Sequence, residues 1–261
     1  MESFEPKPAS ERSPYIIAHR GISGKAPENT LAAFDLACTT AGIDMIEMDV
    51  RLSKDGEVIV LHDRTLQRTS TGNGAARQYT VEEIRQFDAG SWFHPSFSRE
   101  RIPTLREIFQ LINERRWLNI ELKSDYLHRE KPLLLERKVM ELVDTAHAGR
   151  FVLFSSFNHR MVANIKRMNP DALTGVIYNA YRDFGRLPSK LASRAGASVF
   201  VCAKHELTAG MMRDAHQHRL AVYVYTLNST LNAKKMIELG VDGILSDNAD
   251  DLAGSVKGLK S

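Results

Sequence analysis

Short apolar runs recur along the chain, and segments with the spacing of amphipathic helices separate them. Continuous apolar runs such as YIIA and FVLF are typical of strands in a parallel sheet, because helices cover both faces of such a sheet. Eight strands that alternate with helices predict a (β/α)8 TIM barrel, although an open doubly wound sheet would show a similar alternation. The expected strands are Tyr15–Ala18, the run ending at Val50, Leu118–Leu122, Phe151–Ser155, Leu173–Ile177, Ser198–Val201, Ala221–Thr226 and Gly243–Ser246.

The alternation is interrupted after the second expected strand. A turn at residues 53–56 leads into a further apolar run, Val58–Leu61. A parallel crossover needs about a dozen residues, so this run is predicted to return antiparallel, as a hairpin outside the barrel. Residues 64–104 contain many turn-forming residues and are interpreted as a small insertion. Residues 1–14 are interpreted as a flexible tail, and residues 15–261 as one domain.

The composition fits one globular domain and says little about partners. The chain has 261 residues, 43% hydrophobic and 26% charged, which suffices for the core of one barrel. We expect no signal peptide and no membrane span, since no apolar run approaches the ~20 residues that a spanning helix needs. The two cysteines, Cys38 and Cys202, suit a reducing compartment, so a cytoplasmic location is expected. The net charge of +3 gives no reason to expect a nucleic-acid partner.

Acidic side chains are expected at the carboxyl ends of two neighbouring strands, where a barrel carries its active site. Glu47 and Asp49 alternate with apolar residues, so a strand would point both carboxylates to one face. Glu121 and Lys123 alternate in the same way on the next barrel strand. Three carboxylates at one mouth repel one another or require a cation, and oxygen ligands suit Mg²⁺ or Ca²⁺. The alternative is that each carboxylate is a rim residue paired with lysine or arginine.

Two histidines, His19 and His62, each follow an apolar run and lie beside a charged residue. Histidine is the side chain whose ordinary pKa, about 6.5, suits proton transfer at neutral pH, although each could instead bind a metal or pack in the core. Arg20 and Lys123 bring positive charge to the same mouth, either as salt-bridge partners or as ligands for a phosphate. A metal site with these cations favours chemistry on a phosphoester.

The order and spacing of these motifs resemble the glycerophosphodiester phosphodiesterase family, in particular its short cytoplasmic bacterial type. The resemblance covers the chain after the tail and departs mildly at Tyr225, where many members have Trp, and at Ser246, where many have Thr. The motifs are His19-Arg20-Gly21, Pro27-Glu28-Asn29-Thr30, Glu47-x-Asp49, Lys54-Asp55-Gly56, His62-Asp63, Glu121-x-Lys123, Ser155-Ser156-Phe157, Tyr225-Thr226-Leu227-Asn228 and the segment Gly240–Asp247.

The resemblance implies a metal-dependent hydrolase that converts glycerophosphodiesters, such as glycerophosphocholine or glycerophosphoethanolamine, to glycerol 3-phosphate and an alcohol. One divalent ion, Mg²⁺ or Ca²⁺, would polarise the substrate while one histidine accepts a proton and the other donates one. The residues implied are Glu47, Asp49 and Glu121 as metal ligands, His19 and His62 as general acid and base, and Arg20 and Lys123 as phosphate ligands. Supporting roles are expected for Glu28, Asn29, Asn228 and Asp247.

Several alternatives and expectations accompany this reading. Lys123 could form a Schiff base in an aldolase-type barrel, and related phosphodiesterase or phospholipase barrels act on lipid head groups. A non-enzymatic phosphodiester-binding regulator is a third option. The expected partner is a small-molecule substrate, with no stable membrane association and with a homodimer left open. Trp92, Phe93 and Phe97 in the insertion could wall the substrate pocket or form a local core.

Overall fold

The computed structural model describes residues 13–113, 116–124 and 133–256, so the expected tail up to residue 12 lies outside the described residues. Eight parallel strands form a closed barrel, because the first strand pairs with both the second and the last. This closure confirms the predicted TIM barrel and excludes an open doubly wound sheet. The barrel strands are β1 (Tyr15–Ala18), β2 (Met45–Leu52), β4 (Trp117–Leu122), β5 (Val152–Ser156), β6 (Leu173–Ile177), β7 (Val199–Ala203), β8 (Ala221–Tyr225) and β9 (Gly243–Ser246).

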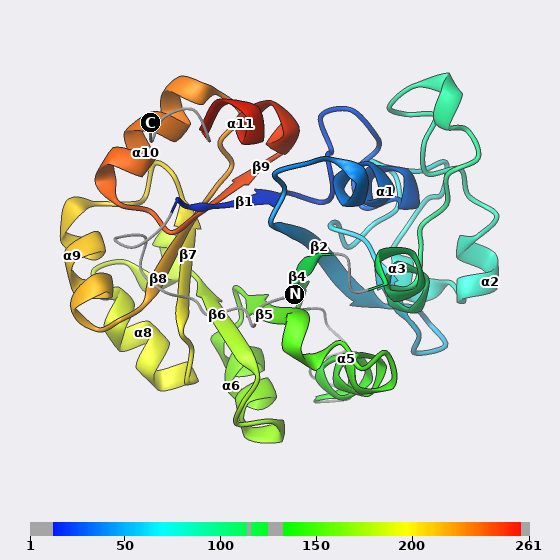
Figure 1. Cartoon of the computed structure of the whole chain (residues 1–261). Helices are drawn as coiled ribbons and strands as arrows, with labels where there is room; N and C mark the ends of the chain where they lie inside the picture. Colours follow the sequence, from blue (N-terminus) through cyan, green and yellow to red (C-terminus); the bar gives the residue numbers. More distant parts are fainter. Residues whose placement is uncertain (1–12, 114–115, 125–132, 257–261) are drawn as a thin grey trace.

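Helices surround the strands on the outside of the barrel (Figure 1). Many begin at a capping side chain; Thr30, for example, accepts a hydrogen bond from the Ala33 amide and starts the first helix. No helix among the described residues is long and apolar enough to cross a membrane. The main helices are α1 (Leu31–Thr39), α3 (Leu105–Ile112), α5 (Leu134–Thr145), α6 (His159–Met168), α8 (Pro188–Ala195), α9 (Ala209–Gln217), α10 (Thr230–Leu239) and α11 (Ala249–Val256).

The side-chain alternation of β2 explains how a fully buried strand serves both the core and the site. All eight of its residues are buried. Ile46, Met48 and Val50 pack in the layer between the strands and the helices, together with residues of α1 and α3. Glu47 and Asp49 therefore point to the opposite face, toward the barrel interior. The predicted period of two is confirmed for this strand.

The predicted hairpin lies outside the eight-strand barrel. Strand β3 (Val58–Val60) pairs antiparallel with β2, with Val60 opposite Val50. The connecting turn is closed by a hydrogen bond from the Ser53 amide to the Glu57 carbonyl, and Gly56 adopts a left-handed conformation with φ of +81°. This turn lies beyond the carboxyl end of β2 and sends the chain back along that strand as far as Asp49, whose carbonyl accepts from the Leu61 amide at 2.9 Å, so that His62 follows directly after the hairpin.

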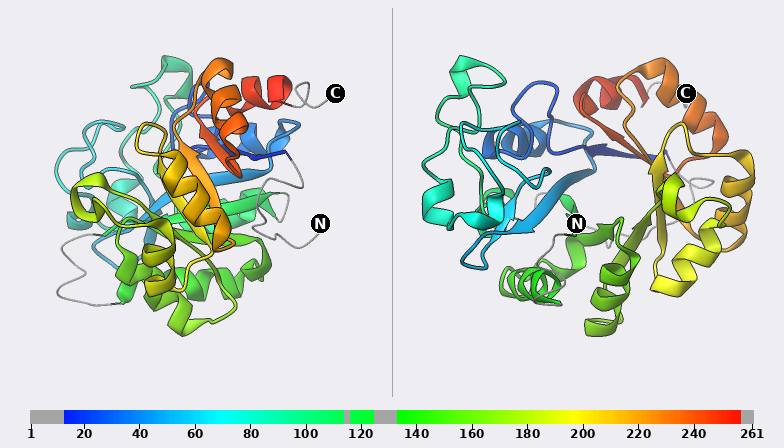
Figure 2. Two further views of the ribbon diagram at one scale, coloured as in Figure 1. Left: turned by 90° about the vertical axis from the view of Figure 1, so that its left-hand side faces the viewer. Right: turned by 180° about the vertical axis from the view of Figure 1, so that it is seen from behind.

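The segment between β3 and α3 adds no strand to the barrel and packs around a small core of its own. It contains the short helices η2 (Ala76–Gln78), α2 (Val81–Ile84) and η3 (Pro95–Phe97). Its buried core includes Leu66 and Ile84, which cluster with residues of the β3 strand. The segment lies beside α1 and α3 in all three views (Figures 1 and 2).

Candidate active site

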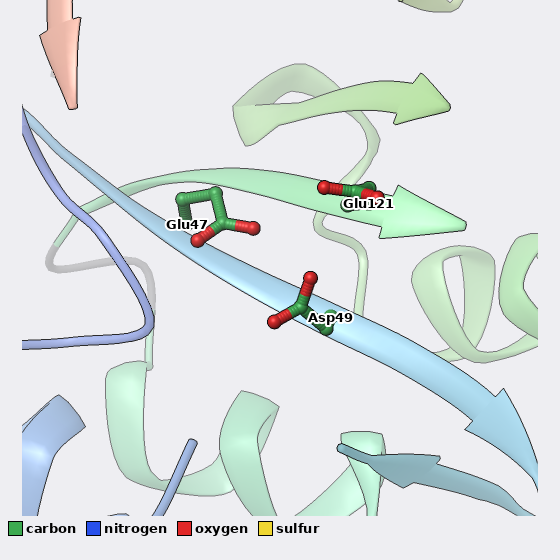
Figure 3. Close-up of side chains that lie close together, drawn as sticks. All are labelled: Glu47, Asp49 and Glu121. Carbon is green, nitrogen blue, oxygen red and sulfur yellow. The ribbon is translucent and has the colours of Figure 1, made fainter. Parts of the chain in front are cut away.

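Three carboxylates meet inside the barrel, near the carboxyl ends of β2 and β4. Asp49 lies directly opposite Glu121 in the parallel ladder, and Glu47 points to the same face of β2 (Figure 3). One carboxylate oxygen from each residue lies within 4.8 Å of the other two. The residues are only 2%, 1% and 8% exposed, so water does little to screen their mutual repulsion. An arrangement of this kind is stable only with protons or cations nearby.

Two cations from the protein approach this cluster. The Lys123 ammonium lies 2.9 Å from Asp49 Oδ1 and also contacts Glu121 Oε1. The Arg20 guanidinium reaches Asp49 Oδ2 at 3.2 Å, while the Arg20 backbone N–H donates to Glu47 Oε2 at 2.9 Å. Two basic side chains thus face three acidic ones, which leaves one carboxylate without a protein cation of its own.

The pKa values of the carboxylates reflect this imbalance. Burial and the neighbouring Asp49 and Glu121 raise the pKa of Glu47 well above its ordinary value. Burial also raises the pKa of Glu121, although Lys123 partly opposes the shift. Burial alone would raise the pKa of Asp49 as well, but Lys123 and Arg20 outweigh it and lower that pKa. Asp49 is therefore ionised, and Glu47 is the carboxylate that most needs a further cation.

The loop after β1 contributes both a backbone amide and a side chain, those of Arg20, to the site. Arg20 has a φ of +57° and Gly21 a φ of +81°, which reverses the chain directly after His19. A Cβ atom on Gly21 would lie 2.6 Å from the Ala33 carbonyl carbon, so glycine is required there. The reversal lets the Arg20 amide bind Glu47 while its side chain reaches Asp49.

His19 is oriented by Asp247, which follows the last barrel strand. The His19 Nδ1 and Asp247 Oδ1 atoms are 2.7 Å apart, and His19 Nε2 lies 4.0 Å from Glu47 Oε2. Asn228 and Ser23 donate to the Asp247 carboxylate at 2.6 and 3.0 Å. Burial opposes ionisation of Asp247, but its hydrogen bond to His19 prevails and lowers its pKa to about 2. Nε2 of His19 is thus the nitrogen that remains for a ligand.

An aspartate also orients His62, but here an arginine holds the carboxylate of that aspartate in place. Nδ1 of His62 lies 2.6 Å from Oδ1 of Asp63, and Oδ2 of that carboxylate accepts from Arg68 Nε at 2.6 Å. Arg68 in turn binds both oxygens of Glu28, and Glu28 accepts from Arg20 at 2.9 Å. The hydrogen bond from Arg68 is the main cause that lowers the pKa of Asp63 to about 2. Burial, the largest influence on His62, lowers the pKa of its imidazole.

The expected site residues converge on one cavity of about 190 Å³. His19, Arg20, Glu47, His62, Glu121 and Lys123 line one part of it, as the sequence predicted. Asp49 lies behind this surface, where Asn29 donates to its Oδ2 at 2.9 Å. The rest of the lining is largely apolar and includes Phe157, Ile177, Val201, Tyr225 and Leu245. The cavity therefore combines a highly charged wall with an apolar wall that suits a carbon skeleton.

The sequence alone does not indicate a role for some residues near the site. Arg68 lies in an irregular loop, and Asp63 belongs to the His62-Asp63 motif without an expected role of its own. The Asn119 side chain also lines the cavity and accepts a hydrogen bond from buried Ser155 at 2.8 Å.

The aromatic residues of the insertion lie away from this cavity. Trp92, Phe93 and Phe97 make successive edge-to-face contacts with one another, and none of them lines the cavity. Trp92 is 42% exposed, and its indole N–H donates to the Ala89 carbonyl at 2.9 Å. The three rings therefore form an aromatic cluster of their own that neither walls the cavity nor belongs to the buried core of the insertion.

A closed (β/α)8 barrel with ionisable side chains gathered in a cavity at the carboxyl ends of its strands is the architecture of a TIM-barrel enzyme. The family is given by sequence: residues 19–251 match the model of the glycerophosphoryl diester phosphodiesterase family, and the chain belongs to this family. It is 35% identical over 244 residues to the glycerophosphodiester phosphodiesterase of Caldanaerobacter subterraneus, with 93% of this chain and 97% of the relative covered.

Solved structures agree with this assignment. A phosphodiesterase from Oleispira antarctica, solved with the product sn-glycerol-3-phosphate, superposes with a TM-score of 0.86 at 30% identity. The match covers 94% of this chain and 97% of that one. A glycerophosphodiester phosphodiesterase from Agrobacterium tumefaciens has a TM-score of 0.78 at 29% identity, over 92% and 99% of the two chains.

Proposed function

We propose that this phosphodiesterase requires one divalent ion, Mg²⁺ or Ca²⁺, and uses His19 and His62 as its general acid and base. Its substrates would be glycerophosphodiesters such as glycerophosphocholine and glycerophosphoethanolamine, and its products glycerol 3-phosphate and the free alcohol. The observation that carries the proposal is the shared cavity: Glu47 and Glu121 of the acidic cluster and both carboxylate-oriented histidines line it together, with Asp49 directly behind them. The product found in the Oleispira antarctica relative supports glycerol 3-phosphate as the product here.

The acidic cluster fits a hard divalent ion. Glu47, Asp49 and Glu121 offer only oxygen ligands, which Mg²⁺ and Ca²⁺ prefer. Lys123 and Arg20 together balance two of the three negative charges, and the raised pKa of Glu47 marks the unbalanced one. When bound, the ion would act as a Lewis acid that lowers the pKa of a substrate hydroxyl and neutralises charge on the phosphate.

Both histidines are oriented for proton transfer. Asp247 and Asp63 occupy the Nδ1 atoms of His19 and His62, so a neutral ring presents its basic Nε2 and a protonated ring presents an acidic Nε2–H. One histidine removes a proton from the glycerol hydroxyl next to the phosphate as that oxygen attacks phosphorus. The other protonates the leaving alcohol as its P–O bond breaks. Water then opens the cyclic phosphate with the two roles reversed, which gives glycerol 3-phosphate.

Arg20 and Lys123 are the groups placed to bind the phosphate. Both line the cavity, and carboxylates hold both in place: Asp49 and Glu28 contact Arg20, and Asp49 and Glu121 contact Lys123. Their positive charge would stabilise the extra negative charge of the pentavalent transition state. The apolar wall with Phe157 and Tyr225 suits the carbon atoms of the glycerol and of the leaving group.

The charge state of Lys123 argues against the aldolase alternative. A Schiff-base lysine must lose its proton, and burial favours that loss. Here burial is outweighed by Asp49 and Glu121, which raise the pKa of Lys123 above its ordinary value. Lys123 is therefore a fixed cation, and we expect no trapping of a carbonyl substrate by borohydride.

The direct test is release of glycerol 3-phosphate from glycerophosphocholine with Mg²⁺ or Ca²⁺. We expect release by the wild type, its loss after treatment with EDTA, and recovery when the ion is restored. His19→Ala and His62→Ala should each lower kcat by about 10²–10⁴-fold. His94→Ala is the matched control, because His94 is an exposed histidine of the insertion whose side chain bonds to Ser96 and does not line the cavity. Full activity in EDTA, or equal rates for wild type and His19→Ala, would refute the proposal.

A further inference from the structure

Of the six large apolar side chains that are exposed in the described part of the chain, the four most exposed belong to segments that start at the catalytic end of the barrel; Trp92 of the insertion and Met168 are the other two. Among the residues that the structure describes, Tyr181 is fully exposed, Phe184 is 85% exposed and Leu187 is 46% exposed. All three lie in the segment 179–190, which joins β6 to α8 and includes the short helix α7 (Ala180–Asp183). Two aromatic rings with this degree of exposure in one short segment indicate that the segment binds a partner.

The topology places this segment on the rim of the active site. Ile177, the last residue of β6, lines the catalytic cavity, and the segment begins two residues later. Leu231, 66% exposed, lies in the first turn of α10, which follows β8 and so starts at the same end of the barrel. Met168, 38% exposed, is the last residue of α6 and lies at the opposite end.

The exposed charged side chains of this segment are all positive. Arg182, Arg186 and Lys190 are exposed. Asp183, the one carboxylate in residues 179–190, is 4% exposed, accepts a hydrogen bond from the Asn179 amide and lies 3.7 Å from Arg186. Bulky apolar side chains therefore alternate with cations, while the single negative charge is buried and paired.

The segment is an ordered platform rather than an unsupported loop. Arg182 donates to the carbonyl oxygen of Phe157, a residue of the cavity wall, at 3.1 Å. The Ala180 amide donates to Glu206 at 3.1 Å, and the Asn179 side chain caps α7 by accepting from the Tyr181 amide. These bonds fix the backbone, so the exposed rings are held outward by a folded turn.

We propose that residues 179–190, together with Leu231, dock this protein on the surface of an anionic phospholipid membrane. The aromatic and leucine side chains would enter the boundary between head groups and acyl chains, while Arg182, Arg186 and Lys190 pair with lipid phosphates. The mouth of the catalytic cavity would then face the lipid surface. This contact is peripheral, reversible and sensitive to salt, so it needs neither a spanning helix nor stable association. It does not depend on the metal or the catalytic histidines.

The chemistry of residues 179–190 matches that of a phospholipid membrane better than that of other partners. The surface offers apolar groups and cations together, which matches a layer of acyl chains beneath phosphates. A glycerophosphodiester is also the head-group portion of a phospholipid without its acyl chains, so the activity of the family concerns molecules of membrane origin. A second copy of this chain would bring another cationic surface to the same place, where like charges would repel.

The test is co-sedimentation with lipid vesicles, since it does not require activity. We expect the wild type to bind vesicles of phosphatidylcholine mixed with phosphatidylglycerol, to release them at high salt, and to bind pure phosphatidylcholine weakly. The double variant Tyr181→Ser/Phe184→Ser should bind at least about tenfold less tightly, and Lys190→Gln about fivefold less tightly. Met168→Ser, the matched control at the opposite end, should bind as the wild type does.

Three results would overturn the proposal. The first is an absence of wild-type binding to anionic vesicles. The second is a loss of binding by Met168→Ser that equals the loss by the double variant. The third, from sedimentation equilibrium without lipid, is a dimer that the double variant abolishes, which would assign the platform to a second copy of this chain. Hydrolysis of dissolved glycerophosphocholine should be unchanged in every variant, so a folding defect is recognised separately.

Discussion

Arg68 and Glu28 form a bidentate ion pair between two loops that are 40 positions apart in the sequence. Nη1 of Arg68 lies 2.7 Å from Glu28 Oε2, and Nη2 lies 2.8 Å from Oε1. The remaining Nε of Arg68 donates to Asp63, the partner of His62, while Glu28 also holds Arg20. One guanidinium from the insertion therefore links the orientation of a proposed catalytic histidine to that of a proposed phosphate ligand.

Replacement of Arg68 should impair catalysis without removing any group that contacts the substrate. We expect Arg68→Gln to lower kcat by about 10–100-fold, the usual effect of losing a partner that orients a catalytic ligand. Arg68→Lys should restore only part of the rate, because an ammonium cannot make three directed bonds to two carboxylates. Steady-state kinetics and the NMR signals of the His62 ring nitrogens measure the two effects. Arg77→Gln, an exposed arginine of the same insertion, is the control; wild-type kcat in both Arg68 variants would contradict this role.

The ion pair between Arg68 and Asp63 should make the stability of the fold depend on pH. Asp63 has a folded-state pKa of about 2, below its ordinary value of 3.8, mainly because of Arg68. A lowered carboxyl pKa stabilises the fold above the unfolded pKa, and this contribution is lost as the pH falls through the folded pKa of about 2. Because Asp63 is partly exposed, we expect Arg68→Gln to cost about 1 kcal/mol at pH 7 through this effect and almost nothing once the pH lies well below the folded pKa. Urea unfolding of both proteins across this range measures the difference; a constant difference at all pH values would exclude this origin.

Metal binding should be visible as a change in stability, independently of activity. A ligand that binds only the folded state stabilises it by about 2.7 kcal/mol at 100 times its Kd, so Mg²⁺ or Ca²⁺ should raise Tm. Asp49→Asn and Glu121→Gln should abolish this rise, because each removes an oxygen ligand from the buried cluster. Asp171→Asn changes an exposed carboxylate elsewhere and should leave it intact. The metal assignment fails if all variants show the same rise as the wild type.

Replacement of Gly21 should be costly for a steric reason that does not apply to Gly56, another left-handed glycine. Gly21 and Gly56 share a φ of +81°, but a Cβ on Gly21 would lie 2.6 Å from the Ala33 backbone, whereas nothing lies within 4 Å of one on Gly56. We expect Gly21→Ala to cost about 2–4 kcal/mol from strain and overlap, and Gly56→Ala about 1 kcal/mol from strain alone. Urea unfolding gives both values. Equal costs would mean that the contact with α1 is relieved by a small shift.

Period-two alternation explains why so much of the site could be predicted. On β2 and β4 it places Glu47, Asp49 and Glu121 on the interior face, whatever the details of packing. The hairpin followed from the length of a four-residue turn, and the barrel from the count of apolar runs. These signals are local, and each needs only neighbouring residues in the sequence to be recognised.

Arg68 could not be found in this way, because its importance depends on partners brought together by the fold. It lies in an irregular loop without periodicity, and Glu28 belongs to a different loop 40 positions earlier. The exposed rings of Tyr181 and Phe184 are a similar case, since an apolar residue in a sequence is expected to be buried. Local patterns predict which face a side chain takes, but not which distant loop meets it.

Asp247 should matter more for the rate than for substrate affinity. Its carboxylate fixes the Nδ1 position of His19 at 2.7 Å, and Asn228 and Ser23 hold that carboxylate in turn. Asp247→Asn keeps the size of the side chain but removes the charge that stabilises a protonated His19, so we expect kcat to fall by about 10–100-fold with little change in KM. Asp250→Asn, which removes a carboxylate that pairs with Lys25 at the surface, is the matched control. An increase in KM with unchanged kcat for Asp247→Asn would contradict this role. It would show that His19 catalyses proton transfer without the Asp247 carboxylate and that Asp247 acts in substrate binding instead.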